Sequence, residues 1–163
     1  ADGKLDVRGR DQAALGGDAA LRAGNGGTGH LRLANVVDAR SANSCSIANG
    51  CGQGGFTDLF GCDVTVTAAG ALLATGPDGG EHSVTAREQL RLQGTLDARR
   101  TDGAGVAGAI RLQYPARVAP ILTGASCASG LGVSWRRGGS PTPSPLTNAC
   151  CNSIETTSRS VRP

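Results

Sequence analysis

The stretch Leu90-Arg91-Leu92-Gln93-Gly94-Thr95-Leu96-Asp97-Ala98-Arg99 carries the pattern that decides the fold. Its leucines and its alanine alternate with polar residues, which is the period of two expected of a β-strand with one buried face. Gly94 falls in the middle of the pattern, where a strand can bend or bulge. A turn rich in glycine and aspartate follows at residues 101–105. The stretch therefore predicts a strand, a bend, a second strand and a turn.

The same pattern recurs at fixed distances along the chain. Residues 64–80 align with residues 88–104 at a shift of 24, which places Val66 on Leu90, Ala68 on Leu92, Gly70 on Gly94, Leu72 on Leu96, Ala74 on Ala98 and Asp78 on Asp102. Residues 31–33 and 38–40 align with residues 90–92 and 97–99 at a shift of 59, which is two periods plus 11. Residues 3–8 repeat the pattern of residues 94–99. A strand, bend, strand and turn repeated at a fixed period predict an all-β solenoid.

Composition limits what can fill the interior of such a fold. Aromatic residues make up 2% of the chain, methionine is absent and glycine numbers 26 of 163, so valine, leucine and alanine must form a narrow core. We expect the repeats to span residues 1–125, with an insertion at about residues 41–61 that accounts for the extra 11 residues. Residues 126–163 are expected to form an irregular capping segment and an extended tail rich in proline and serine.

Four blocks of sequence resemble a known class of proteins. They are Cys62-Asp63-Val64-Thr65-Val66, Gly70-Ala71-Leu72-Leu73-Ala74-Thr75-Gly76, Leu90-Arg91-Leu92-Gln93-Gly94-Thr95-Leu96 and Gly108-Ala109-Ile110-Arg111-Leu112. The combination resembles glycine-rich repeat proteins that bacteria secrete or display on their surface, over about the first 125 residues. The resemblance implies a short right-handed parallel β-helix and an extracellular or cell-surface location.

The six cysteines form an even set in a chain that lacks large core residues, so disulfides in an oxidising compartment are the expected use. The candidates are Cys45, Cys51, Cys62, Cys127, Cys150 and Cys151. Cys45 and Cys51 could close a short loop, whereas Cys150 and Cys151 should each seek a different partner. A zinc site is not expected, because the sequence has no CxxC pair and only two histidines. We assign no metal and no cofactor.

Charge and hydropathy bear on partners. The net charge is only +3 and the arginines are spread along the chain without interleaved aromatics, so we do not expect nucleic acid as a partner. No apolar stretch of 18 residues is present, which predicts no transmembrane segment. The partners that remain are polysaccharides or other cell-surface components, and the oligomeric state stays open.

Three aspartates occupy equivalent outward positions in three copies of the repeat. Asp6, Asp38 and Asp97 are each followed two residues later by an arginine, at Arg8, Arg40 and Arg99. One interpretation is a solvated ladder of ion pairs; the other is a column of carboxylates that acts on or binds a polysaccharide. Trp135 could stack on a sugar or cover the end of the repeats. The candidate ligand-binding residues are Asp38, Asp97, Arg99 and Trp135, and no catalytic residue is assigned.

Other motifs carry weaker signals. Asp78 and Asp102 could belong to a calcium cluster, but aspartate in glycine-rich turns is usually structural. Residues 26–31 approach the calcium-binding repeat GGxGxD, yet Leu31 stands where the aspartate ligand should be. His30 and His82 are interpreted as surface or edge residues.

The sequence leaves several functions open. The leading hypothesis is a secreted or cell-surface structural or adhesive repeat module, because repeats and cysteines are present and no catalytic constellation stands out. The alternative is a polysaccharide-active lyase or hydrolase, or a carbohydrate-binding remnant of one. Ice binding is a third hypothesis, but Thr65, Thr67 and Thr95 are too few for a regular array.

Overall fold

The computed structural model describes residues 4–9, 15–24, 28–41, 45–46, 50–102, 105–129 and 133–138. Every regular element in these ranges is a β-strand. The first seven are β1 (Leu5–Asp6), β2 (Asp18–Arg22), β3 (His30–Leu33), β4 (Val36–Asp38), β5 (Cys45–Ser46), β6 (Gly50–Cys51) and β7 (Phe56–Val66). The remaining six are β8 (Ala71–Leu73), β9 (Glu81–Leu92), β10 (Thr95–Asp97), β11 (Ala109–Pro115), β12 (Ser126–Ala128) and β13 (Val133–Gly138). The described residues contain no helix that could span a lipid bilayer.

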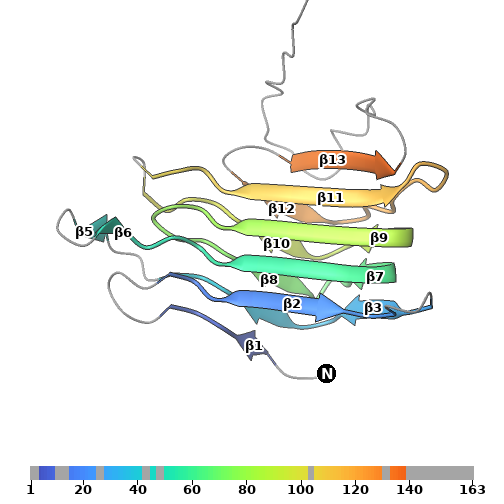
Figure 1. Cartoon of the computed structure of the whole chain (residues 1–163), viewed down its shortest axis with the longest axis horizontal. Coiled ribbons are helices and arrows are strands. Elements are labelled where there is room, and N and C mark those ends of the chain that lie inside the picture. Colours follow the sequence, from blue (N-terminus) through green and yellow to red (C-terminus); the bar gives the residue numbers. More distant parts are fainter. Residues whose placement is uncertain are drawn as a thin grey trace, which may run out of the picture.

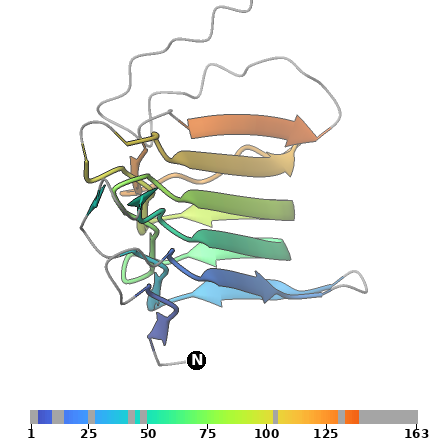
Figure 2. The same cartoon turned by 60° about the vertical axis from the view of Figure 1, so that its left-hand side comes forward.

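The strands form two parallel sheets that lie one behind the other (Figures 1 and 2). Sheet A has five strands in the order β1-β4-β8-β10-β12, and sheet B has six, in the order β13-β11-β9-β7-β2 with β3 also on β7. From β7 to β13 the chain alternates between the sheets, so β7, β9 and β11 of sheet B are each followed by a short strand of sheet A. Consecutive strands of one sheet therefore lie side by side in parallel.

The core lies between the two sheets and is built from aliphatic side chains. Along β7, β9 and β11 buried and exposed positions alternate, as a strand with one covered face requires. The inward residues stack in columns from strand to strand, such as Leu59, Val84 and Leu112 in sheet B. Leu72 and Leu96 form the matching column in sheet A, and all five side chains are at most 1% exposed. A core of this kind needs no large aromatics, in agreement with the composition.

The prediction of a short right-handed parallel β-helix with a disulfide-bearing insertion is wrong. The described strands form two separate sheets that do not join into a closed solenoid. One physical reason lies near the N-terminus, where β2 and β3 both pair with the single long strand β7. Another is that β5 pairs antiparallel with β6 and enters neither sheet, so Cys45 lies opposite Cys51 in a separate hairpin. No disulfide is seen in the described part of the chain, and the predicted tail at residues 139–163 lies outside it.

The repeat shift of 24 is confirmed in sheet A and wrong in sheet B. Thr95 pairs with Ala71 and Leu96 with Leu72, as the shift requires. In sheet B, however, Val66 pairs with Leu92 rather than with Leu90. The shift is already 25 where Phe56 pairs with Glu81, and a bulge between Gly61 and Asp63 raises it to 26. The connection between β7 and β8 is correspondingly longer than that between β9 and β10, which restores the shift of 24 in sheet A.

Glycine pairs let the two sheets approach closely where the long strands β7 and β9 of sheet B begin. Gly54 precedes Gly55 just before β7, and Gly79 precedes Gly80 just before β9. A Cβ atom on Gly80 would lie 2.4 Å from the Gly55 carbonyl oxygen and 2.5 Å from that of Ala74, closer than real Cβ atoms come. The backbones at Gly55 and Ala74 can therefore approach this closely only because Gly80 has no side chain.

Candidate functional site

The three Asp-x-Arg motifs fold into the same local structure on the outer face of sheet A. In each motif the arginine Nε donates to Oδ1 of the aspartate two residues before it and Nη2 donates to Oδ2, at distances from 2.6 to 2.9 Å. The backbone N–H of the arginine also points to Oδ1, at 3.2 to 3.4 Å. The two residues share a face because side chains two apart on a strand point the same way. The motif therefore makes a bidentate ion pair within a single strand passage.

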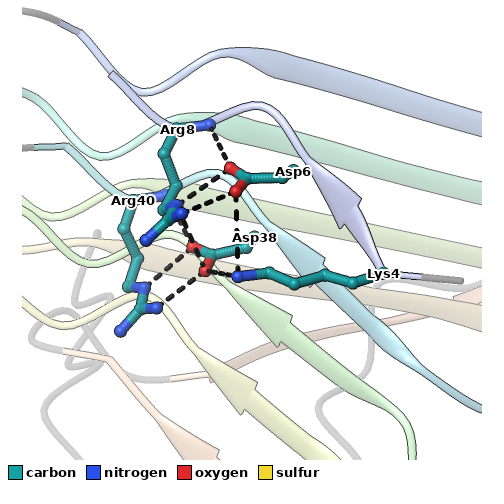
Figure 3. Close-up of polar contacts among 5 residues, drawn as sticks. All are labelled: Lys4, Asp6, Arg8, Asp38 and Arg40. Atoms are coloured by element: carbon teal, nitrogen blue, oxygen red, sulfur yellow. Dashed lines mark hydrogen bonds and ion pairs between the residues drawn. The ribbon is translucent and has the colours of Figure 1, made fainter. Parts of the chain in front are cut away.

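The first two motifs join into one cluster with Lys4 (Figure 3). Asp6 and Asp38 are register partners in the β1–β4 pair, so their carboxylates stack on neighbouring strands. Lys4 Nζ lies 2.7 Å from Asp38 Oδ2 and 3.9 Å from Asp6 Oδ2. Arg8 Nε lies 3.6 Å from Asp38 Oδ2, so Arg8 also spans both carboxylates. Two carboxylates are thus held by three cations, and the Asp38 side chain is 0% exposed.

The cluster keeps its carboxylates ionised. Burial alone would raise the pKa of Asp38, but the hydrogen bonds from Arg40 and Lys4 outweigh it and bring the pKa down to about 2. The hydrogen bonds from the Arg8 side chain and backbone hold the pKa of Asp6 well below its usual range. In turn, the aspartates raise the pKa of Arg8 and Arg40. At neutral pH the two carboxylates and the two guanidinium groups are therefore charged.

The third motif stands apart from the other two. Leu73 occupies the register position between Asp38 and Asp97, and Thr75 follows it where an arginine would complete a fourth motif. The Arg99 side chain is 63% exposed, compared with 42% for Arg40. Burial would raise the pKa of Asp97, but the hydrogen bonds from Arg99 outweigh it and lower the pKa. The motif is the same, but its neighbours leave it more open to water.

The prediction that Asp6, Asp38 and Asp97 are equivalent is confirmed, because their register positions form one column of sheet A. The outward position of Asp38 does not make it solvent-exposed, since Lys4, Arg8 and Arg40 cover it. Chemically, such a column can hold a sheet edge together and present a charged surface. It is unsuited to general acid catalysis, which needs a carboxyl with a raised pKa.

A second polar pair lies inside the core, and sequence reasoning missed it. His82 on β9 and Thr57 on β7 are register partners, and Thr57 Oγ1 lies 2.7 Å from His82 Nδ1. Both side chains are 0% exposed, so the prediction of a surface position for His82 is wrong. The alternation of His82, Val84 and Ala86 along β9 was the available signal, because all three occupy inward positions. His82 Nε2 has no partner with hydrogen-bond geometry among the described residues.

Burial determines the protonation state of His82. Removal from water lowers its pKa to about 4, and the backbone groups of Asp97 and Leu72 only partly oppose this effect, together with the charge of Asp97. The imidazole is therefore neutral at physiological pH. A neutral buried imidazole with one hydrogen-bonded nitrogen is typical of a core residue.

The other candidate residues are scattered. Trp135 lies on β13 and pairs in register with Leu112, and its side chain is outside the described part. Asp78 accepts a hydrogen bond from the backbone N–H of Val106 at 2.6 Å, which is a loop-stabilising role. His30 is exposed and its Nδ1 lies 2.7 Å from Asp63 Oδ2. Cys62 and Cys127 are buried on β7 and β12, and Cys150 and Cys151 lie outside the described residues.

Within the described ranges, no group of three or more histidine, cysteine, aspartate or glutamate side chains is placed to hold a metal ion. Asp78 and Asp102 therefore do not assemble such a cluster there. A scan against protein-family models matched no family, and searches of curated proteins and of solved structures found no match. The function proposed below rests on the geometry of the chain.

Proposed function

We propose that the chain is a structural or adhesive module that is secreted or displayed at a cell surface. The observation that carries the proposal is the Asp-x-Arg column of sheet A, which uses its carboxylates for internal ion pairs. Parallel strands stacked in register present regular, wide faces, and such faces suit contact with extended partners. The partners in view are polysaccharides or other cell-surface components.

The alternative of a polysaccharide-active enzyme draws on the same column and is disfavoured by its electrostatics. A hydrolase needs one carboxyl that is protonated at working pH and one that is ionised. The pKa values of Asp6, Asp38 and Asp97 are all lowered, and each carboxylate is occupied on both oxygens by its own arginine. A substrate would have to displace these bidentate pairs before it reached a carboxylate.

A pull-down separates these functions. The chain, coupled to beads, is offered isolated cell-wall polysaccharide, intact cells and extracellular matrix proteins, with beads that carry the urea-unfolded chain as the control. We expect the folded chain alone to retain at least one of the three. Retention of none would overturn the adhesive proposal and leave a scaffold role. Incubation with acidic and neutral glycans, with and without calcium, should release no new reducing or unsaturated ends; their release would establish the enzyme.

A further inference from the structure

The arginines on the outer face of sheet B differ in whether a carboxylate neutralises them. Arg22 Nη2 lies 3.1 Å from Asp58 Oδ2, and Arg111 Nη1 contacts Glu81 Oε1. Arg32 on β3 and Arg91 on β9 make no ion pair with any described residue. Both are exposed. These two guanidinium groups are therefore available to an outside partner, whereas that of Arg87, also exposed on β9, lies over the Phe60 ring at 4.9 Å from its centroid.

Arg32 and Arg91 belong to one column of the sheet. Arg32 pairs in register with Thr65, and Thr65 pairs with Arg91, so the hydroxyl-bearing residue separates the two arginines. The residues on either side of each are directed inward, as the burial of Leu33, Val66 and Leu90 shows, so all three column members face outward. Because neighbouring strands lie about 4.8 Å apart, the backbones at the two arginines are separated by about 10 Å.

The surroundings of the column are weakly charged, and one neighbour is apolar: Ile121 bridges in register with Arg91 and is 36% exposed. His30, Asp63 and Gln89 form the preceding column on the same face. Asp63 is already engaged by His30, and the Gln89 amide donates to the backbone oxygens of Leu90 and Ala119. The one carboxylate among these neighbours is thus occupied by a histidine and does not approach either arginine within ion-pair distance among the described contacts.

We propose that the Arg32–Thr65–Arg91 column binds a carboxylated polysaccharide. This inference rests on the proposed adhesive function and names its partner by chemistry. Each guanidinium can form a bidentate pair with a carboxylate, and the Thr65 hydroxyl can donate to or accept from a sugar hydroxyl between them. A polyuronate repeats carboxylates along an extended chain, so a single strand of it can reach both arginines at once. Two simultaneous contacts raise affinity beyond that of either alone.

Charge complementarity alone would also admit a single-stranded nucleic acid, but the column lacks the second feature that such a ligand needs. Nucleic-acid channels combine basic groups with aromatic side chains on which bases stack. Among the described residues, no phenylalanine, tyrosine or tryptophan occupies this column or the His30–Asp63–Gln89 column beside it. The net charge of +3 is also small for a nucleic-acid surface.

Binding of polygalacturonate to the whole chain, measured by titration calorimetry at low and at moderate salt, tests the inference. The key variant is Arg32→Gln/Arg91→Gln. Its matched control is Arg22→Gln/Arg111→Gln, which removes the same charge from the same face but from arginines that already have carboxylate partners. We expect binding by the wild type to weaken about tenfold in the key variant and to stay within about twofold in the control. Unchanged circular dichroism and thermal unfolding confirm that both variants fold.

Three outcomes would overturn the inference: no binding of polygalacturonate by the wild type, an equal loss in both double variants, or single-stranded DNA bound as tightly and lost with the same arginines. Neutral dextran should not bind. The adhesive function is judged separately by the pull-down. If the wild type and Arg32→Gln/Arg91→Gln retained cells equally, the adhesive function would be supported, and the Arg32–Thr65–Arg91 column would not be the site responsible for it.

Discussion

The outer column of sheet A and the inner column of sheet B both remove a titratable side chain from water, and the two side chains respond in opposite ways. On the outside, Asp38 is fully covered yet charged, because Lys4 and Arg40 supply the hydrogen bonds that water would have made. On the inside, His82 is covered by aliphatic side chains and stays neutral, with Thr57 as its hydrogen-bond partner. Burial alone therefore does not fix a charge state; the partners that accompany it do.

The largest expected effect comes from removing the inner pair. The pKa of His82 is 6.5 in an unfolded chain and about 4 in the folded protein. Between these pH values the unfolded chain binds a proton that the folded protein does not, so the free energy of unfolding falls as the pH drops, by roughly 3 kcal/mol in total. Thr57→Val/His82→Leu should abolish this loss without leaving either polar group unpaired. Urea unfolding at a series of pH values from 7 to 4 measures it.

His30→Gln is the control for that experiment, because it removes an exposed imidazole from the same sheet. This variant should still lose free energy of unfolding as the pH drops, because that loss is attributed to His82. Parallel pH profiles for the wild type and Thr57→Val/His82→Leu would show that His82 does not titrate as a buried neutral group.

Within the outer column, the loss of stability can be compared between Asp38, which contacts several cations, and Asp97, which pairs with one arginine. Asp38→Asn removes the charge shared by Lys4, Arg8 and Arg40, and we expect it to lower the free energy of unfolding by about 2 kcal/mol at pH 7. Asp97→Asn breaks one pair whose arginine is largely exposed, so its cost should stay below about 1 kcal/mol. Chemical denaturation of both variants gives the difference. Equal losses would mean that the network around Asp38 adds nothing to a single motif.

Asp38 and His82 affect the stability of the protein over different ranges of pH, because their pKa values in the folded protein differ. The pKa of Asp38 is lowered to about 2 from an ordinary value of 3.8, so its contribution to stability is fully present above about pH 4 and is lost as the pH falls toward 2. The His82 effect is complete by about pH 4. The two contributions therefore do not overlap, and the acid limb of the pH profile below 4 reports on the outer column.

The repeat of Asp38 and Asp97 could be predicted from sequence because a short motif recurred at one shift and because alternation fixes which residues share a face. The pairing in sheet B could not, since its register shift is 25 before a bulge beside Gly61 and 26 after it, and no residue type marks either change. The closure of the fold was also mispredicted. The local pattern of strand and turn is compatible with a closed coil, and only long-range pairing shows β2 and β3 sharing β7.

The burial of His82 was a different kind of error. Its inward position follows from the alternation with Val84 and Ala86, but a histidine was assumed to prefer the surface. The partner that makes its burial tolerable, Thr57, lies on another strand, 25 residues away. Propensity considered one residue at a time gives the wrong side of the sheet when a hydrogen-bond partner from a distant strand offsets the cost of burial.

The smallest effect is expected from a double variant at the position that separates the two halves of the outer column. Leu73→Asp would place a fourth carboxylate in the column, between Asp38 and Asp97, on strands about 4.8 Å apart, and like charges opposite each other destabilise a sheet. We expect a loss of about 1 kcal/mol that shrinks as salt is added. Adding Thr75→Arg rebuilds the Asp-x-Arg motif, so the double variant should recover to within about 0.5 kcal/mol of the wild type. Thr75→Arg alone is the control, and thermal unfolding at low and high salt is the measurement. Failure of the arginine to rescue Leu73→Asp would show that the motif depends on more than its two charged residues, because Thr75 occupies the same place after Leu73 as Arg40 does after Asp38.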